Sequence, residues 1–426
     1  MLITITMRLH ISIILLFITC RTLAQNQPMV YEDKTYLPEI KTVEFYNTKK
    51  EGSFPLIPLN SGEQVMLSFD DLSGQSKILN YTLEHCDAQW NSSRLSPIEY
   101  LQGFTEDRLM EYRYSTATRQ KYIHYELTLP NQNLSPKLAG NYLLKVYQNG
   151  DQSKPVLTRR LYVVGSKVSI TAQMVPSGNV SQRNTNQKIN FSVEYAGLNV
   201  QNPYTDIRTL IMQNARPETG IWNTRPANIR GSQLIYNDIA TNDFPGRNEF
   251  RHFDTRSLKL NSERIGHIYR DTANTVILLP DPKRDQPDYV FQYDNDGKFF
   301  VINQDGRDGR TDGDYAHMYF TLLANKTAFD GSAYIVGQFN NYRLDEQSKL
   351  KYDASLMRFY TDLYLKQGVY DYGYVWVDAK TKTPDDTVLE GNHFETENDY
   401  QILVYFRAPG ARWEELVGYR VLNTAK

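Results

Sequence analysis

Short stretches of the chain alternate apolar and polar residues with a period of two. Residues 65–69, 79–83, 125–129 and 142–146 follow this pattern, and turn residues such as those at 149–151 separate the runs. Because successive side chains of a strand point to opposite faces of its sheet, the pattern predicts strands that bury one face. The sequence therefore predicts an all-β protein of short strands and frequent turns, which is typical of β-sandwiches.

A chain of 426 residues is too long for a single core, because domains usually hold about 100–150 residues. We expect three tandem immunoglobulin/fibronectin-like β-sandwiches in a row, separated late in the chain by a flexible linker rich in Gly, Asp and Arg. The expected ranges are 25–165 for the N-terminal sandwich, 166–303 for the middle sandwich, 304–314 for the linker and 315–426 for the C-terminal sandwich.

A hairpin is predicted near the end of the middle range. The turn sequence Asp294-Asn295-Asp296-Gly297 is flanked by strand-like runs at 289–293 and 298–302. A turn of this composition between two such runs favours a tight connection between antiparallel strands.

The N-terminus has the pattern of a secretory signal peptide, at residues 1–24. Its apolar run, residues 11–20, is too short to span a membrane, and Ala24 ends a plausible cleavage site. We therefore expect an exported protein. Whether Cys20 carries a lipid stays open. After cleavage the only cysteine is Cys86, which cannot form an intramolecular disulfide and is interpreted as a buried strand residue.

Charge and motifs argue against several functional classes. The 47 basic and 49 acidic residues leave a net charge of −2, whereas nucleic-acid binding usually needs a basic face. The sequence has no HExxH, GxSxG, P-loop or GxGxxG motif, and its histidines are scattered. We therefore predict a protein that is not an enzyme, without a cofactor or a metal.

Two charged segments are candidates for binding a partner protein. One is a strand-like run in which charged residues alternate with Phe250. The charged face of this run is either a docking ridge for a partner or an ordinary solvated strand face. The other is an irregular loop that combines Trp with several Arg, as interface hot spots do, unless its Trp simply caps the core. The candidate residues are Glu249 and Arg251 in the first segment and Arg216, Trp222, Arg225 and Arg230 in the second.

The expected linker also raises the question of calcium, because clustered carboxylates on a bendable loop can supply its oxygen ligands. The carboxylates are Asp305, Asp308, Asp312 and Asp314. Their spacing does not match an EF-hand, and Arg307 and Arg310 would repel a cation. A solvated linker is the favoured interpretation, and calcium binding stays open.

Several stretches resemble the plug proteins of the type IX secretion system of Bacteroidota. The stretches are 234–236, 246–251, 253–258, 293–297, 334–342 and 390–400. The resemblance implies a non-catalytic periplasmic protein, peripherally associated with the outer membrane. Its expected partner is the outer-membrane translocon barrel, which it occludes when no substrate is passing. Its oligomeric state stays open.

The C-terminal range also resembles the early-set sandwiches that bind starch or glycogen, through residues 337–342, 359–363 and 368–372. This likeness implies an alternative function, a periplasmic glycan-binding protein that stacks sugars on Tyr342 and Trp376. Tyr342 stands where such modules commonly carry a Trp, and the usual Lys is missing from residues 374–376.

Overall fold

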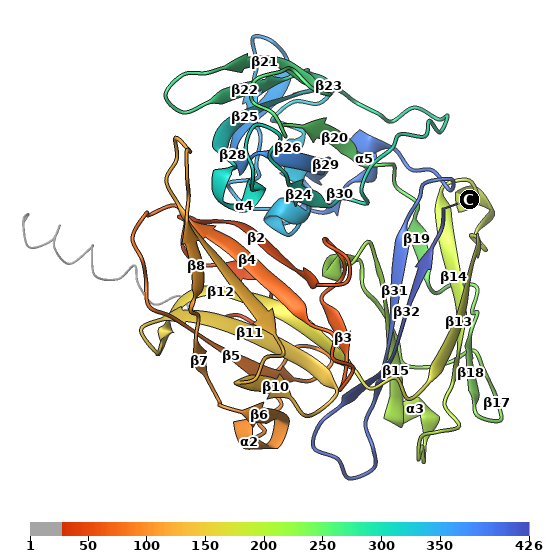
Figure 1. Cartoon of the computed structure of the whole chain (residues 1–426). Helices are drawn as coiled ribbons and strands as arrows, with labels where there is room; N and C mark the ends of the chain where they lie inside the picture. The colour runs from red at the N-terminus through yellow and green to blue at the C-terminus, as the bar shows by residue number, and fades with distance from the viewer. Residues whose placement is uncertain (1–27, 426) are drawn as a thin grey trace, which may run out of the picture.

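The computed structural model describes residues 28–425 and shows an all-β protein, as predicted (Figure 1). The expected signal peptide, its cleavage after Ala24 and the question of Cys20 lie outside the described residues. The sheets pack face to face around apolar cores, as in β-sandwiches. Within residues 28–425, no helix is long and apolar enough to cross a membrane.

The N-terminal sandwich follows the predicted alternation closely. Its elements are β1 (Lys34–Thr35), β2 (Ile40–Asn47), β3 (Leu56–Pro58), β4 (Val65–Asp71), β5 (Leu79–Cys86), α2 (Pro97–Tyr100), β6 (Leu101–Gly103), β7 (Asp107–Arg108), β8 (Glu111–Tyr114), β9 (Ile123–Leu129), β10 (Leu134–Pro136), β11 (Gly140–Gln148) and β12 (Asp151–Val164). One sheet has the order β1-β12-β11-β5-β7, with β3 on β12, and the other has the order β2-β4-β9-β8. Val65, Leu67 and Phe69 are buried in the core between them.

The middle sandwich is discontinuous in sequence. Its elements are β13 (Ser169–Pro176), the 3₁₀ turn Val180–Gln182, β14 (Asn186–Glu194), α3 (Pro203–Asp206), β15 (Ile207–Gln213), the 3₁₀ turn Pro217–Thr219, β16 (Ile221–Asn223), β17 (Asn228–Arg230), β18 (Gln233–Tyr236), β19 (Asp243–Pro245), β31 (Asp399–Phe406) and β32 (Glu415–Asn423). One sheet has the order β13-β14-β18-β17, and the other has the order β16-β15-β31-β32. Ile211 of β15 lies opposite Ile402 of β31, so strands from the end of the chain complete this sandwich.

The segment between β19 and β31 forms a further sandwich, here called the inserted sandwich. Its elements are β20 (Arg251–Asp254), β21 (Ile265–Tyr269), β22 (Thr275–Leu278), β23 (Asp281–Pro282), β24 (Phe299–Val301), α4 (Gly309–Asp312), β25 (Tyr315–Leu323), β26 (Gly331–Val336), the 3₁₀ turn Gln338–Asn340, β27 (Lys351–Asp353), β28 (Arg358–Lys366), β29 (Gly368–Asp378), β30 (Pro384–Asp385) and α5 (Thr387–Glu390). Its sheets are ordered β21-β22-β25-β28-β27 and β20-β29-β24, with β26 and β30 also on β29.

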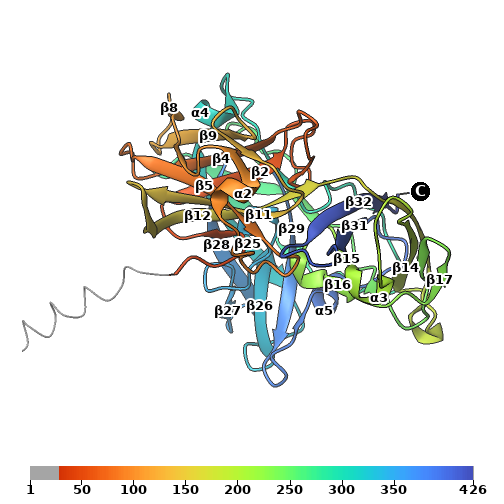
Figure 2. The ribbon, with the colours of Figure 1, turned by 90° about the horizontal axis from the view of Figure 1, so that it is seen from below.

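This pairing differs from the sandwich boundaries expected from the sequence. The ranges 166–303 and 315–426 put β20 and β24 in the middle sandwich, yet both strands pair with β29. The same ranges put β31 and β32 in the C-terminal sandwich, yet β31 pairs with β15. Local alternation identifies strands but not their partners, and the insertion separates strands that pair. The sandwiches therefore meet around a common junction instead of following one another in a row (Figures 1 and 2).

The predicted hairpin around Asp294–Gly297 does not form. Residues 289–293 belong to no strand, and β24 pairs with β29 instead. The turn sequence serves another purpose, because the Asp294 carboxylate accepts a hydrogen bond from the backbone N–H of Phe250. The N–H of Asn295 donates to the buried carboxylate of Asp371.

The expected linker, residues 304–314, is not a free connector. It contains α4 and packs between the inserted and N-terminal sandwiches. Arg310 Nη1 donates to Glu126 Oε1 at 2.9 Å, and Tyr122 Oη donates to the Gly313 carbonyl at 2.8 Å. Arg113 pairs with Asp308 at 2.8 Å. The Gly-rich composition thus allows a folded segment to lie close against a neighbouring sandwich.

Candidate functional site

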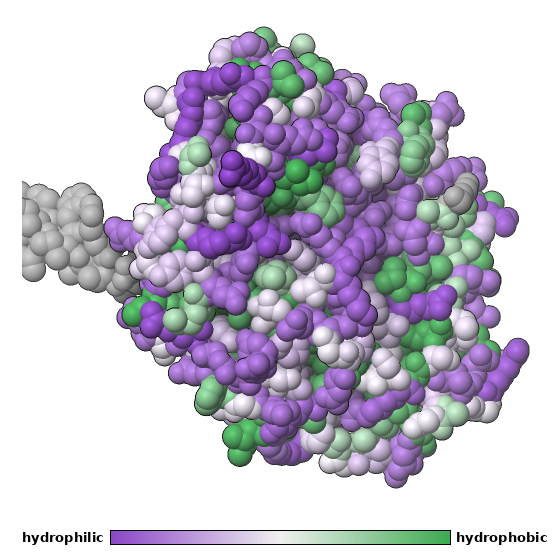
Figure 3. All heavy atoms as spheres, viewed as in Figure 1, coloured by the Kyte–Doolittle hydropathy of each residue, from purple (hydrophilic) through white to green (hydrophobic). Residues whose placement is uncertain are grey.

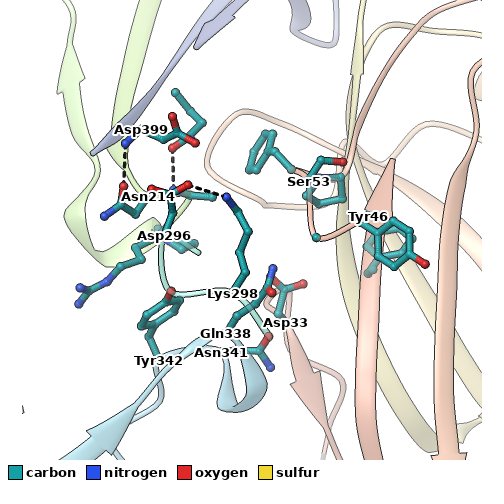
Figure 4. A pocket seen from close by; sticks show the side chains of 18 of the residues that line it. Asp33, Tyr46, Ser53, Asn214, Asp296, Lys298, Gln338, Asn341, Tyr342 and Asp399 are labelled. Atoms are coloured by element: carbon teal, nitrogen blue, oxygen red, sulfur yellow. Dashed lines mark hydrogen bonds and ion pairs between the residues drawn. The ribbon is translucent and has the colours of Figure 1, made fainter. Parts of the chain in front are cut away.

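A cavity of about 1570 Å³ lies where the sandwiches meet (Figure 4). The N-terminal sandwich contributes β2, β3 and the segment that contains Ser53 and Phe54 to its lining, and the middle sandwich contributes β31, β32 and the turn after β15. The inserted sandwich contributes Lys298 and Tyr342, and the Tyr342 hydroxyl donates to the Gly297 carbonyl at 3.1 Å. Figure 3 shows that the surface along this junction is mainly hydrophilic.

Arg216, a predicted partner-binding residue, lies buried in one wall of this cavity. Its guanidinium stacks over the Tyr342 ring at 4.7 Å and pairs with Asp386 at 3.1 Å. Asp386 also pairs with Arg247. Burial opposes ionisation of Asp386, but the two guanidinium groups outweigh it and hold the pKa of Asp386 below its usual range. Arg216 therefore joins the middle and inserted sandwiches, and it is not exposed to a partner.

Glu249 and Arg251 are also buried, so the predicted docking ridge does not exist. Arg251 Nε donates to Glu390 Oε1 at 3.0 Å, and Arg251 Nη1 donates to Asp281 Oδ1 at 3.2 Å. Glu249 accepts the Tyr289 hydroxyl and the Glu397 N–H. Arg251 and Glu249 therefore pair with carboxylate, hydroxyl and amide groups of segments distant in the sequence. The local alternation of charges with Phe250 cannot reveal such partners.

The predicted Trp and Arg loop divides between core and surface. Trp222 packs at 5.7 Å from Tyr405, and Arg208 lies over its ring at 5.3 Å. The alternative in which Trp222 caps the core therefore fits the structure. Arg225 and Arg230 are exposed, so they are the predicted partner-binding residues that the fold leaves accessible.

Tyr342 and Trp376, which the glycan alternative predicts to stack on sugars, do not form a common exposed surface. Trp376 is only 2% exposed and packs edge-on against Phe359 at 5.8 Å. Arg216 covers the ring of Tyr342. Trp376 therefore offers no free surface on which a sugar would stack, and Arg216 occupies one face of Tyr342, whose ring lines the cavity.

The N-terminal and inserted sandwiches meet at a buried charge cluster that sequence patterns did not reveal. Lys366 Nζ lies 2.7 Å from Asp70 Oδ2, and His124 Nδ1 lies 2.6 Å from Asp70 Oδ1. Tyr315 donates its hydroxyl to Asp70 at 2.7 Å, and Lys366 lies over the Tyr122 ring at 4.1 Å. Burial opposes ionisation of Asp70, yet Lys366 and His124 outweigh it and lower the pKa of Asp70. For Lys366 the effect of burial prevails, and the pKa of its ammonium group is lowered.

The aspartates of residues 304–314 are engaged by protein donors. Asp305 accepts the Ser257 hydroxyl at 2.8 Å, Asp308 pairs with Arg113, and Asp312 accepts the Thr116 hydroxyl. In the part of the chain that the structure describes, no three His, Cys, Asp or Glu side chains are grouped so as to hold a metal ion. Asp308 and Asp312 therefore serve the contact with the N-terminal sandwich, whereas Asp305 is held within the inserted sandwich.

Cys86 lies in β5 and is buried, as predicted. Burial raises the pKa of its thiol to about 12 and lowers the pKa of the neighbouring His85 to about 4. A thiol with so high a pKa is a poor nucleophile at neutral pH, because the thiolate is the reactive form.

Comparison with known proteins places the fold in a family. Residues 40–165 match the model of the type 9 secretion system plug protein 1st domain. A hypothetical protein from Parabacteroides merdae, of known crystal structure, is 31% identical. That match covers 93% of this chain and 100% of that chain, with a TM-score of 0.88.

A dimeric latent PorU from Porphyromonas gingivalis matches 92% of this chain and 34% of that chain. It is 11% identical, with a TM-score of 0.14. A search of curated proteins finds no match. The resemblance found in the sequence is thus confirmed by the first domain, and the chain belongs to the type 9 secretion system plug protein family.

Proposed function

We propose that the protein is a non-catalytic periplasmic plug that binds the outer-membrane translocon barrel of the type IX secretion system. It occludes the barrel when no substrate is passing. The observation that carries this proposal is the match of residues 40–165 to the first plug domain. The signal-peptide pattern of residues 1–24 supports export to the periplasm.

A plug for a wide barrel needs a stiff body, because a barrel of about 36 strands encloses a lumen through which solutes would leak. The contacts between sandwiches suit this task. An apolar cluster joins the N-terminal and middle sandwiches through Leu143, Tyr162, Leu210 and Leu403. Buried charges join the N-terminal and inserted sandwiches through Asp70 and Lys366. A body fixed in this way on both sides resists bending more than domains on a flexible tether.

The mechanism would be binding and release. No residue makes or breaks a covalent bond in this mechanism, and the accessible surface supplies the contacts. Arg225 and Arg230 remain candidates for such contacts because they are exposed.

Affinity purification of the tagged mature chain from envelope extracts tests this proposal, with the barrel identified by mass spectrometry. We expect the giant barrel to co-purify, and we expect deletion of the protein to increase entry of large antibiotics and dyes. A complementing wild-type copy should restore the barrier. Absence of the barrel from the purified material, together with unchanged permeability, would contradict the proposal.

A further inference from the structure

Strand β8 is an open edge of the N-terminal sandwich. It ends the sheet order β2-β4-β9-β8 and pairs only with β9, in an unbroken register. It lies on the side of that sandwich that faces away from the middle sandwich (Figure 1). All four of its residues are exposed, and none of them is a Pro, a Lys or a residue with a positive φ. Because proteins usually protect sheet edges with such residues or with bulges, β8 is available to pair with another strand.

The hydrogen-bond ladder shows which backbone groups of β8 point outward. Just beyond the strand, the Ser115 N–H donates to the Tyr122 carbonyl at 2.9 Å. Hydrogen-bonded and non-hydrogen-bonded pairs alternate along an antiparallel ladder, so the N–H and C=O groups of Tyr112 and Tyr114 point away from β9. No other segment within residues 28–425 bonds to these four groups. They are therefore free to form a ladder with a further strand.

The apolar face of β8 is only partly covered. Tyr112 and Tyr114 are 43% and 57% exposed, and Met110, directly before the strand, is 64% exposed. The Tyr112 ring lies 5.7 Å from the ring of Tyr125, which is fully buried in the core. This face therefore continues the core face of the sheet, and a further strand beside β8 would extend it.

The charged face of β8 carries one residue of each sign. Glu111 stands opposite another carboxylate, Glu126, and has no ion pair in the part of the chain that the structure describes. Arg113 pairs with Glu126 at 3.0 Å and with Asp308 at 2.8 Å, yet 47% of its side chain stays exposed. Glu111 thus lacks a cation, and the accessible part of Arg113 can approach a further carboxylate.

These charges select one register for the pairing of β8 with a second copy of itself. In an antiparallel pair centred on Tyr112, Glu111 lies opposite the partner's Arg113, and Tyr114 lies opposite the partner's Met110. The neighbouring registers that also join outward-pointing backbone groups place Glu111 opposite the partner's Glu111, or Arg113 opposite the partner's Arg113. Like charges directly opposite each other disfavour both of these registers, whereas the centred one pairs opposite charges twice.

We propose that β8 pairs with β8 of a second copy of this chain and forms a symmetric dimer. The two Tyr112 backbones exchange hydrogen bonds at the centre, and the sheet continues from one copy into the other. A single edge strand forms a small interface, so we expect a dissociation constant of about 1–100 μM. This inference goes beyond the proposed function and does not depend on the barrel.

Sedimentation velocity of the mature chain over a range of concentrations tests the dimer. Glu111→Arg places two cations opposite each other, and Arg113→Glu places two carboxylates opposite each other. We expect each variant to dimerise at least about tenfold more weakly than wild type. An equimolar mixture of the two variants should form a heterodimer, because it restores opposite charges at both pairs. Glu346→Arg, at a side chain that is 90% exposed on the inserted sandwich, is the matched control and should keep the wild-type affinity.

Cysteine pairs test the register. Residues of a non-hydrogen-bonded antiparallel pair lie about 4.5 Å apart at Cα, within the range that a disulfide spans. Glu111→Cys mixed with Arg113→Cys should therefore yield a disulfide-linked heterodimer on mild oxidation, and neither variant alone should yield a linked homodimer. The native Cys86 is buried and should not compete.

Hydrogen–deuterium exchange of the wild-type chain supplies a readout that needs no substitution. The amides of Tyr112 and Tyr114 should exchange more slowly as the concentration of the chain rises through the dissociation constant. A chain that stays monomeric at the highest concentration, or Glu111→Arg protein that dimerises like wild type, would overturn the inference.

Two further outcomes would also overturn it. A dimer in which these amides exchange as fast as in the monomer would show that another surface joins the copies. Amides that are slowed by purified barrel, but not by a higher concentration of the chain, would assign the β8 edge to the barrel. Binding of the barrel is measured separately, so the plug proposal can stand where the dimer fails, and the dimer can stand where the plug proposal fails.

Discussion

Lys366 Nζ lies 2.7 Å from Asp70 Oδ2, with both side chains fully buried between the N-terminal and inserted sandwiches. The two residues come from strands far apart in the sequence, β4 and β28. Isolated charges are strongly disfavoured away from water, so each depends on the other and on His124, Tyr315 and the Arg310 carbonyl. This buried pair joins the two sandwiches together with the more exposed Arg310–Glu126 and Arg113–Asp308 pairs.

Removing one partner of this pair should destabilise the protein strongly. Lys366→Met leaves the Asp70 carboxylate buried without its cation, and we expect the free energy of unfolding to fall by about 3–5 kcal/mol. The double variant Asp70→Asn with Lys366→Met should recover part of this loss. Urea unfolding followed by fluorescence measures both. Lys49→Met, which breaks the exposed Lys49–Glu63 pair, is the control and should cost about 1 kcal/mol or less. Equal losses at the two sites would contradict this role of the buried pair.

His85 should make the fold sensitive to acid. Its ring is buried, neither ring nitrogen has a partner among the described residues, and burial lowers its pKa from 6.5 to about 4. Between these values the unfolded chain binds the proton and the folded chain does not, so stability falls as pH is lowered from 6.5 towards 4. The loss amounts to about 3 kcal/mol, at about 1.4 kcal/mol for each pK unit.

His85→Phe keeps an aromatic ring beside Tyr142 and removes the titrating group. We expect the variant to match or exceed wild-type stability at pH 7 and to lose less stability on acidification. His124, whose pKa is raised despite burial because Asp70 and Glu126 favour its charged form, is present in both proteins and cancels in the comparison. Parallel stability curves from pH 7 to pH 4 would show that His85 does not titrate in this way.

Ile402→Ala tests the discontinuous middle sandwich. Ile402 is fully buried opposite Ile211, so the cavity should cost about 2–5 kcal/mol. Because β31 pairs with β15, hydrogen exchange should speed up in residues 207–213 more than in β25 or β28. Val421→Ala, at a position 40% exposed on β32, is the control. Faster exchange in the inserted sandwich, with β15 unchanged, would argue against the observed pairing.

Trp376→Ala should lower the free energy of unfolding. It should not alter sugar binding, because the wild-type chain is expected to bind no sugar. The side chain is buried in the core of the inserted sandwich, so its removal should cost about 3–5 kcal/mol. Calorimetry of the wild-type chain with millimolar maltooligosaccharide should show no heat of binding, because Trp376 is buried and Arg216 occupies one face of Tyr342, so the two rings cannot act together as a stacking platform. Binding heat that disappears in Tyr342→Ala would restore the glycan alternative.

The sequence predicted the strands of the N-terminal sandwich well, because alternation such as that of residues 65–69 directly reflects a buried face and an exposed face. It did not predict that β31 returns to pair with β15, since pairing between distant strands depends on side-chain packing that no local pattern contains. Residues 289–293 have strand composition but pair with no strand within residues 28–425. Composition alone cannot distinguish a paired strand from an unpaired segment of the same composition.

The candidate site was less predictable for a related reason. The alternation of charges around Phe250 suggested an exposed ridge. In the structure Arg251 is instead buried, where it forms ion pairs with Glu390 and Asp281. Asp70 and Lys366 carried no signal at all, because a charged residue at a strand end is normally solvated. The Gly, Asp and Arg composition of residues 304–314 resembled a free linker, although its carboxylates bond to distant donors.

The conductance of the purified translocon barrel in a planar bilayer is the most direct test of the plug proposal. Addition of the mature chain to the periplasmic side should close most of the open current, and washing with chain-free buffer should restore it. An open-channel current that is unchanged at saturating wild-type protein would contradict the proposal that this protein occludes the barrel.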